Sequence, residues 1–186
     1  EITAYIMNKK INIFWFRRDL RLDDNLGFFE ALKDEHPVLP IFIFDDKILD
    51  KLPKDDARVT FIHETLQNLR QILQDERKSS IALYKGEPID IYKQLIADFD
   101  IDKVYTNHDY EPYATERDNA IKTLLEKHQI EFKTYKDQVI FEKSDIVKND
   151  GKPYMVYTPY MRKWKEKFRT IDLEIFYTNS YLNNLI

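Results

Sequence analysis

The sequence predicts an α/β fold built on a doubly wound, five-stranded parallel sheet with helices on both faces. Short apolar runs and amphipathic segments alternate from residue 11 to residue 135, as in sheets whose parallel strands are joined by helices. The chain has 186 residues, of which 43% are hydrophobic and 33% charged, so it is long enough to bury a core. The strand order expected for this fold class is 3-2-1-4-5.

The expected strands are short segments between charged or turn-forming residues, and the first two are apolar runs. The five are Ile11–Phe16, Pro37–Phe44, Ile81–Tyr84, Lys103–Thr106 and Glu131–Tyr135. Pro37 and Pro40 are placed at the start of the second strand, where a missing N–H group is tolerated.

The helices between the strands are recognised by apolar residues at three- and four-residue steps. They are Leu26–Lys33, a long helix carrying Ile62, Leu66, Leu69 and Leu73, a helix carrying Ile91, Leu95 and Ile96, and Glu116–Lys127. The alternation ends after Tyr135. A turn at Asp150–Pro153 and a short basic helix at Met161–Phe168 follow.

Three regions are expected along the chain. Residues 1–6 precede an internal Met7, and we interpret them as a remnant of cloning that lies outside the fold. Residues 7–136 form the α/β domain. Residues 137–186 are a C-terminal segment and the start of a linker, because Tyr177–Ile186 is polar and aromatic.

Composition excludes several kinds of function. The net charge of −4 and the pI of about 5.6 argue against a broad basic field for nucleic acid. Without cysteine there is no disulfide framework, which fits a cytoplasmic protein, and no apolar run is long enough to cross a membrane. The glycine-rich phosphate loops and the common nucleophile motifs are missing as well.

Polar residues follow the first and fourth strands. Three arginines and three aspartates lie between Arg17 and Asp24, and we expect them to form a salt-bridge network within the turn; Asp23, Asp24 or Asn25 caps the next helix. After the fourth strand, Asp109 and Glu111 can accept hydrogen bonds from a ligand, and Tyr110 or Tyr113 can stack on a flat ring. The alternative is that these charges only brace the loops or cap helices.

Five stretches, taken together and in order, resemble the DNA photolyase/cryptochrome family. They are Trp15–Asn25 (WFRRDLRLDDN), Val38–Leu49, Asp56–Ile62, Asn107–Asp118 (NHDYEPYATERD) and Gly151–Trp164. The resemblance implies the N-terminal α/β domain of a DNA photolyase, a carbon–carbon lyase that repairs pyrimidine dimers with blue light. Its FAD and its site for damaged DNA would lie in a C-terminal helical domain that is missing here, so this fragment is expected to be inactive alone. A cryptochrome photoreceptor is the alternative.

The resemblance also implies an antenna chromophore in this domain. Members that use methenyltetrahydrofolate carry a Y-E-V-N-E motif, whose asparagine and glutamate are replaced here by Tyr113 and Ala114. An 8-hydroxy-5-deazaflavin or flavin is therefore the expected chromophore. Asp109 and Glu111 would contact its polar edge, Phe42 its ring, and Arg58 its polar side. A purely structural module without a chromophore, or a nucleotide-binding stress-type domain, stays open.

Overall fold

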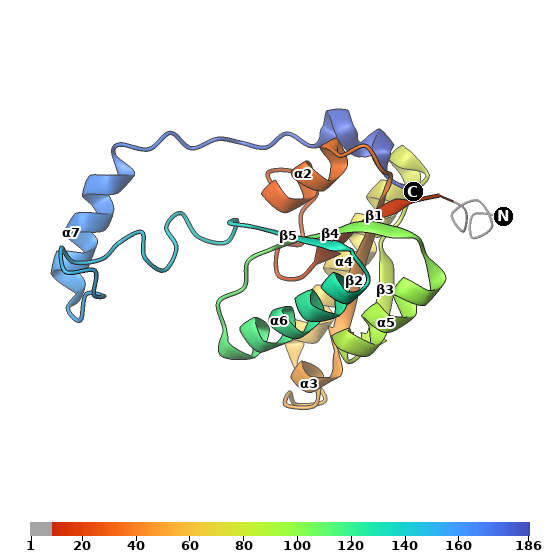
Figure 1. Ribbon diagram of the computed structural model, residues 1–186, viewed down its shortest axis with the longest axis horizontal. Coiled ribbons are helices and arrows are strands. Elements are labelled where there is room, and N and C mark those ends of the chain that lie inside the picture. The colour runs from red at the N-terminus through yellow and green to blue at the C-terminus, as the bar shows by residue number, and fades with distance from the viewer. Residues whose placement is uncertain (1–8) are drawn as a thin grey trace. The chain divides into compact units, whose positions relative to one another are not determined.

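The computed structural model describes residues 9–186 and contains a five-stranded parallel sheet (Figure 1). Its order, β3-β2-β1-β4-β5, confirms the expected topology. The strands are β1 (Ile11–Phe16), β2 (Val38–Asp45), β3 (Ala82–Gly86), β4 (Ile101–Asn107) and β5 (Glu131–Tyr135). The prediction for residues 1–6 lies outside the described residues.

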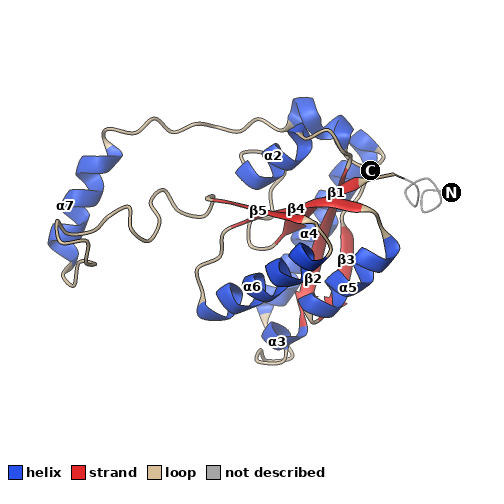
Figure 2. Cartoon of the chain, in the orientation of Figure 1, coloured by secondary structure: helices blue, strands red, loops and turns tan. Residues whose placement is uncertain are grey.

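Helices cover both faces of the sheet, as the sequence predicts (Figure 2). They are α2 (Leu26–Lys33), α4 (Ala57–Arg77), α5 (Pro88–Asp98) and α6 (Pro112–Lys127), with one short helix α3 (Asp46–Leu49) after β2. Tyr92 of α5 and Ile121 of α6 pack with Trp15 on one face, whereas Phe28 of α2 and Leu66 of α4 pack with Phe16 on the other. Successive β1 side chains therefore enter opposite halves of the core.

Pro40 lies inside β2 and not at its start, which corrects the sequence-based placement. The residue pairs with Phe14 of β1, but pairing of β2 with β3 begins one residue later, at Ile41. At Pro40 the strand is therefore paired with β1 only, so the missing N–H interrupts no pairing with β3.

Helix α6 begins at Pro112, four residues before the predicted start. Proline suits the first helical position, because its ring fixes φ and its missing N–H would have no helical partner there. The early start brings Tyr113, Ala114 and Arg117 onto the helix next to the loop that follows β4.

The predicted salt-bridge network within the turn after β1 is wrong in its partners. Arg17 pairs with Asp118 at 2.8 Å and Arg21 with Asp137 at 2.7 Å, so these arginines reach acidic residues far along the chain. Asn25 is the residue that caps α2, through a 3.2 Å hydrogen bond from the Phe28 N–H. The arginines of the turn are therefore paired with other elements, whereas Asp19 braces the turn by accepting hydrogen bonds from the Arg17 N–H and the Asn25 side chain.

The chain divides into two compact units. The first contains residues up to Asp137 together with Phe176–Ile186, and the second is Gln138–Ile175. In the first, the 3₁₀ helix η1 (Asn179–Asn184) follows Thr178, whose N–H donates to Asp23, and a parallel bridge joins Leu185 to Val38. The last residues of the chain therefore belong to the same unit as the sheet.

The second unit contains helix α7 (Tyr157–Phe168), which starts four residues before the predicted Met161. Within this unit Trp164 stacks on Phe168 at 4.9 Å and contacts Phe141 edge-on at 5.4 Å. That residues 137–186 connect to a further domain stays a prediction. Among residues 9–186, no helix combines the length and the hydropathy that crossing a membrane requires.

Candidate functional site

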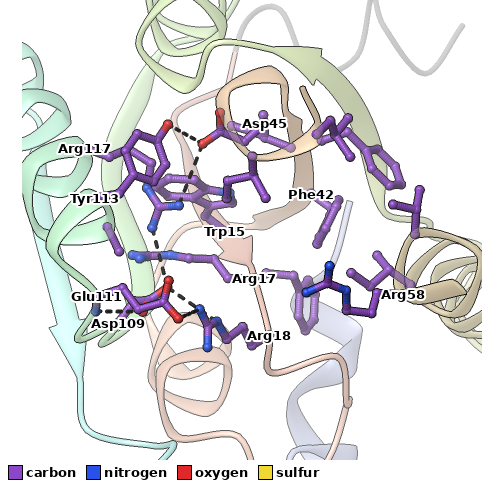
Figure 3. A pocket seen from close by; sticks show the side chains of 18 of the residues that line it. Trp15, Arg17, Arg18, Phe42, Asp45, Arg58, Asp109, Glu111, Tyr113 and Arg117 are labelled. Atoms are coloured by element: carbon purple, nitrogen blue, oxygen red, sulfur yellow. Dashed lines mark hydrogen bonds and ion pairs between the residues drawn. The ribbon is translucent and has the colours of Figure 1, made fainter. Parts of the chain in front are cut away.

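A cavity of about 400 Å³ opens at the carboxyl ends of β1 and β2 and beside the loop that follows β4 (Figure 3). Strand order reverses between β1 and β4, and ligands of open α/β sheets bind beside such a reversal. The volume falls within the range of small-molecule sites. All four residues that the sequence singles out, Phe42, Arg58, Asp109 and Glu111, line this cavity.

One wall of the cavity is apolar. Phe42 and Phe44 of β2 meet edge to face at 4.9 Å, and Val59 and Ile62 of α4 add aliphatic surface. Phe42 is buried and packs on the α2/α4 side of the core, so its position is held by its neighbours. A flat aromatic ligand would find a rigid hydrophobic surface here.

Trp15, the penultimate residue of β1, forms the base of the cavity between two arginines. The guanidinium of Arg17 lies 4.4 Å from its ring centroid and that of Arg117 lies 4.9 Å away. Tyr92 contacts the same indole edge-on at 5.5 Å. The cation–π contacts fix the ring, because both cations are themselves buried and anchored.

Arg17 is held by partners from two later elements. Its Nε donates to Thr106 Oγ1 at 2.8 Å and its Nη1 to Asp118 Oδ2 at 2.8 Å. Burial lowers the pKa of Arg17, although the nearby Asp118 carboxylate opposes this. The third nitrogen, Nη2, is buried and makes no hydrogen bond to any residue from 9 to 186.

A second polar cluster, which was not predicted from the sequence, is formed by Asp45, Tyr113 and Arg117. The Tyr113 hydroxyl donates to Asp45 Oδ2 at 2.6 Å, and Arg117 Nη1 lies 4.0 Å from the same oxygen. Burial and this hydrogen bond raise the pKa of Tyr113, so the phenol stays protonated. The sequence feature that could have indicated this cluster is Asp45. This residue ends β2 at the same edge of the sheet where β1 and β4 end.

Asp109 and Glu111 lie together at the opposite side of the cavity from Phe42 (Figure 3). The carboxylate of Asp109 is buried, 3.7 Å from Arg18 and 4.0 Å from Arg117. Glu111 has a 63% exposed side chain and accepts a 2.5 Å hydrogen bond from Arg18, which raises the pKa of that arginine. Glu111 is the N-cap residue of α6, but its side chain accepts no hydrogen bond from the helix. Asp109 accepts one from the Glu111 N–H at 3.4 Å, so part of the bracing alternative holds.

Arg58 lies on α4, across the cavity from Asp109. Its side chain is 72% exposed and pairs with Asp56, the N-cap of the helix, at 2.6 Å. The side-chain and backbone hydrogen bonds from Arg58 lower the pKa of Asp56 to about 2. Of the two tyrosines predicted to stack on a ligand, Tyr113, which lies on α6, lines the cavity, and Tyr110 does not.

The fold and the cavity define an α/β domain with a ligand-sized site at its topological switch point. The family model of DNA photolyase matches residues 12–176. The chain therefore belongs to the DNA photolyase family.

Similar proteins include photolyases and cryptochromes. The deoxyribodipyrimidine photo-lyase of a Synechococcus species is 33% identical over 153 residues, which are 82% of this chain and 31% of that protein. Cryptochrome-1 of Drosophila melanogaster is 27% identical and matches 81% of this chain and 29% of its own length.

Among solved structures, an archaeal photolyase from Sulfolobus tokodaii superposes with a TM-score of 0.74 at 30% identity. The match covers 89% of this chain and 36% of that one. That structure holds two FAD molecules and is described as implying a novel light-harvesting cofactor. The chain thus spans about a third of the length of each of these three relatives.

Proposed function

We propose that this chain is the N-terminal light-harvesting domain of a deoxyribodipyrimidine photo-lyase and that the cavity holds its antenna chromophore. The observation that carries the proposal is the cavity of about 400 Å³ at the switch point, with the aromatic pair Phe42 and Phe44 on one side and Asp109 and Glu111 on the other. When bound, the chromophore absorbs light and passes the energy to FAD. That FAD, the repair of pyrimidine dimers and the contact with damaged DNA belong to a C-terminal helical domain of the longer protein.

The chromophore that fits best is an 8-hydroxy-5-deazaflavin or a flavin. Phe42 packs against its ring, Arg58 supports its polar side, and Asp109 and Glu111 face its polar edge. The folate alternative is disfavoured because the Tyr113 hydroxyl is already committed to Asp45 and Ala114 carries no polar group.

Two other functions are distinguishable from this one. A purely structural module would fill the crevice with its own aromatic side chains, and the remaining cavity of about 400 Å³ argues against that. A cryptochrome photoreceptor is supported by the Drosophila relative, which is less similar than the photolyase from Synechococcus. Repair of pyrimidine dimers under blue light by the full-length protein would separate photolyase from cryptochrome.

The antenna site can be tested by fluorescence, because the two tryptophans lie in different units. Trp15 lines the cavity, so a Trp164→Phe variant leaves a single reporter at the site. We expect 8-hydroxy-5-deazaflavin or a flavin to quench this emission saturably, and Phe42→Ala to weaken the binding.

Methenyltetrahydrofolate is the matched comparison ligand in the same titration. Tighter binding of the folate would refute the choice of chromophore. If neither a deazaflavin nor a flavin quenched the Trp15 emission saturably, the antenna function itself would be refuted.

A further inference from the structure

The end of the turn after β1 holds two segments that are distant in the sequence. Arg21 Nη2 donates to Asp137 Oδ1 at 2.7 Å, and Asp137 is the last residue before the second unit. Asp24 is bonded to Phe176, the first residue after that unit: the Asp24 N–H donates to Phe176 O at 2.9 Å, and the Phe176 N–H donates to Asp24 Oδ1 at 3.3 Å. The chain thus leaves the unit that contains the sheet, and returns to it, at one turn. We call this turn, residues 21–24, the clasp.

Residues 176–186, which we call the strap, lie beside α2 within the unit that contains the sheet (Figure 1). Thr178 of the strap is only 1% exposed. Its N–H donates to Asp23 Oδ1 at 2.9 Å, and its hydroxyl donates to Leu22 O at 2.5 Å. The clasp therefore binds the strap through a buried threonine as well as through the backbone of Phe176.

Aromatic and apolar contacts hold the strap against α2 and the core. The ring of Phe29 on α2 lies 5.5 Å from the ring of Phe176 and 5.4 Å from that of Tyr181. Leu182 is 5% exposed and packs in the α2/α4 half of the core. Removing apolar surface of this kind from water is the main favourable contribution to association.

The far end of the strap satisfies backbone oxygens at the end of α2. The side-chain amide of Asn184 donates to the oxygens of Leu32, Asp34 and His36, at 3.1, 3.0 and 3.0 Å. Carbonyl groups at the C-terminus of a helix have no partner within the helix. The strap therefore supplies hydrogen bonds that α2 cannot make for itself.

Burial begins abruptly within the strap. Leu173 and Ile175, which precede it, are 62% and 54% exposed, whereas Thr178 and Leu182 are 1% and 5% exposed. The contacts that hold the strap thus come from its own residues and not from the segment that leads to it.

We propose that the strap binds as a self-contained peptide ligand, held by the clasp and α2, and that this binding does not need the chain between Asp137 and Phe176. Neither the strap nor the clasp lines the cavity, so the proposal is independent of the antenna function. The Ile186 N–H donates to the oxygen of Val38, the first residue of β2, at 3.1 Å. In the longer protein proposed above, the strap would fix the place from which the chain continues, at the edge of the sheet opposite the cavity.

Cleavage of the full chain tests the proposal. A specific protease site inserted after Asp172, in an exposed segment without helix or strand, leaves the strap attached by non-covalent contacts alone. We expect the cut protein to elute from gel filtration at micromolar concentration as one species, in which mass spectrometry detects both pieces. Separate elution of the C-terminal piece would overturn the proposal.

A synthetic peptide of residues 176–186 measures the interaction in the cut protein. The labelled peptide should replace the C-terminal piece saturably. T178V in the peptide should weaken binding about tenfold, the factor that 1.4 kcal/mol represents, because it removes a buried hydrogen bond to Leu22 O. S180A is the matched control: it removes an exposed hydroxyl and should leave the affinity unchanged.

The protein is the same in all of these titrations, so a folding defect cannot cause a difference between peptides. Equal affinities of the parent and T178V peptides would overturn the proposal. An equal loss of affinity in the S180A peptide would overturn it as well, because the buried contact with the clasp would then not be what the binding depends on.

Discussion

Replacing Arg17 with alanine is expected to destabilise the domain far more than the same change at its neighbour Arg18. The Arg17 side chain is 7% exposed and donates two 2.8 Å hydrogen bonds, whereas that of Arg18 is 54% exposed. Removing one partner of a buried ion pair costs about 3–5 kcal/mol. An exposed pair contributes at most about 1 kcal/mol.

For Arg17 we expect the lower end of the range for a buried ion pair, about 3 kcal/mol. Its partner Asp118 keeps a second cation, since Arg117 Nη2 lies 3.1 Å from the other carboxylate oxygen. We therefore expect a loss of about 3 kcal/mol, which includes the lost cation–π contact with Trp15. For a chain of this size the loss corresponds to a fall of roughly 6–12 °C in Tm.

Urea unfolding followed by circular dichroism measures the effect in both variants and the parent. The slope of the transition should stay the same, so that the midpoint reports stability. If Arg17→Ala shifted the midpoint no more than Arg18→Ala does, the assignment of Arg17 as a buried structural anchor would be refuted. Arg17→Lys keeps the charge without the planar fork and should fall between the two.

Three further predictions follow from single contacts. Gly27→Ala should cost about 1–3 kcal/mol in a urea titration, because an added Cβ would lie 2.5 Å from Asn107 Oδ1; a midpoint equal to the parent's would disprove the close packing. Asp109→Ala should weaken flavin binding in calorimetry more than Glu111→Ala does, since Asp109 is buried beside two arginines; the reverse order would contradict this. Burial raises the pKa of Asp34, but hydrogen bonds from a tyrosine and a lysine outweigh it and hold that pKa well below its ordinary value of 3.8. The ionised Asp34 therefore stabilises the fold fully above pH 3.8, and this contribution is lost as the pH falls through the folded-state pKa. An Asp34→Asn variant that unfolds in acid with the same profile as the parent would refute this.

Much of the fold was predictable from local pattern. The bounds of β1, α2 and β5 agree with the prediction residue for residue. For β1 and α2 the reason is that an apolar run or a helical stripe ends abruptly at charged residues. Pro40 was misplaced because tolerance for proline depends on whether the neighbouring strand pairs at that position, which the residues of β2 do not reveal. The start of α6 was misjudged because Pro112 was treated as part of the loop.

The candidate site was predictable only in part. Asp109 and Glu111 were identified from their place after the fourth strand, and Phe42 and Arg58 from a family resemblance. The structure places all four around one cavity. Whether they bind a chromophore stays a prediction. Asp45 was overlooked, because a single aspartate at a strand end is a common feature, and its hydrogen bond from a phenol 68 residues later has no sequence signal.

By itself the sequence determined which segments are helices or strands, that the sheet is parallel, and which polar side chains follow the strands at their carboxyl ends. Only the tertiary structure decided which charges meet. Arg17 is paired with a carboxylate 101 residues away and Arg18 with one 93 residues away, although aspartates lie nearer in the same turn. The physical reason is that secondary structure follows from neighbours along the chain, whereas ion pairs form between groups that the strand order brings to the same edge of the sheet.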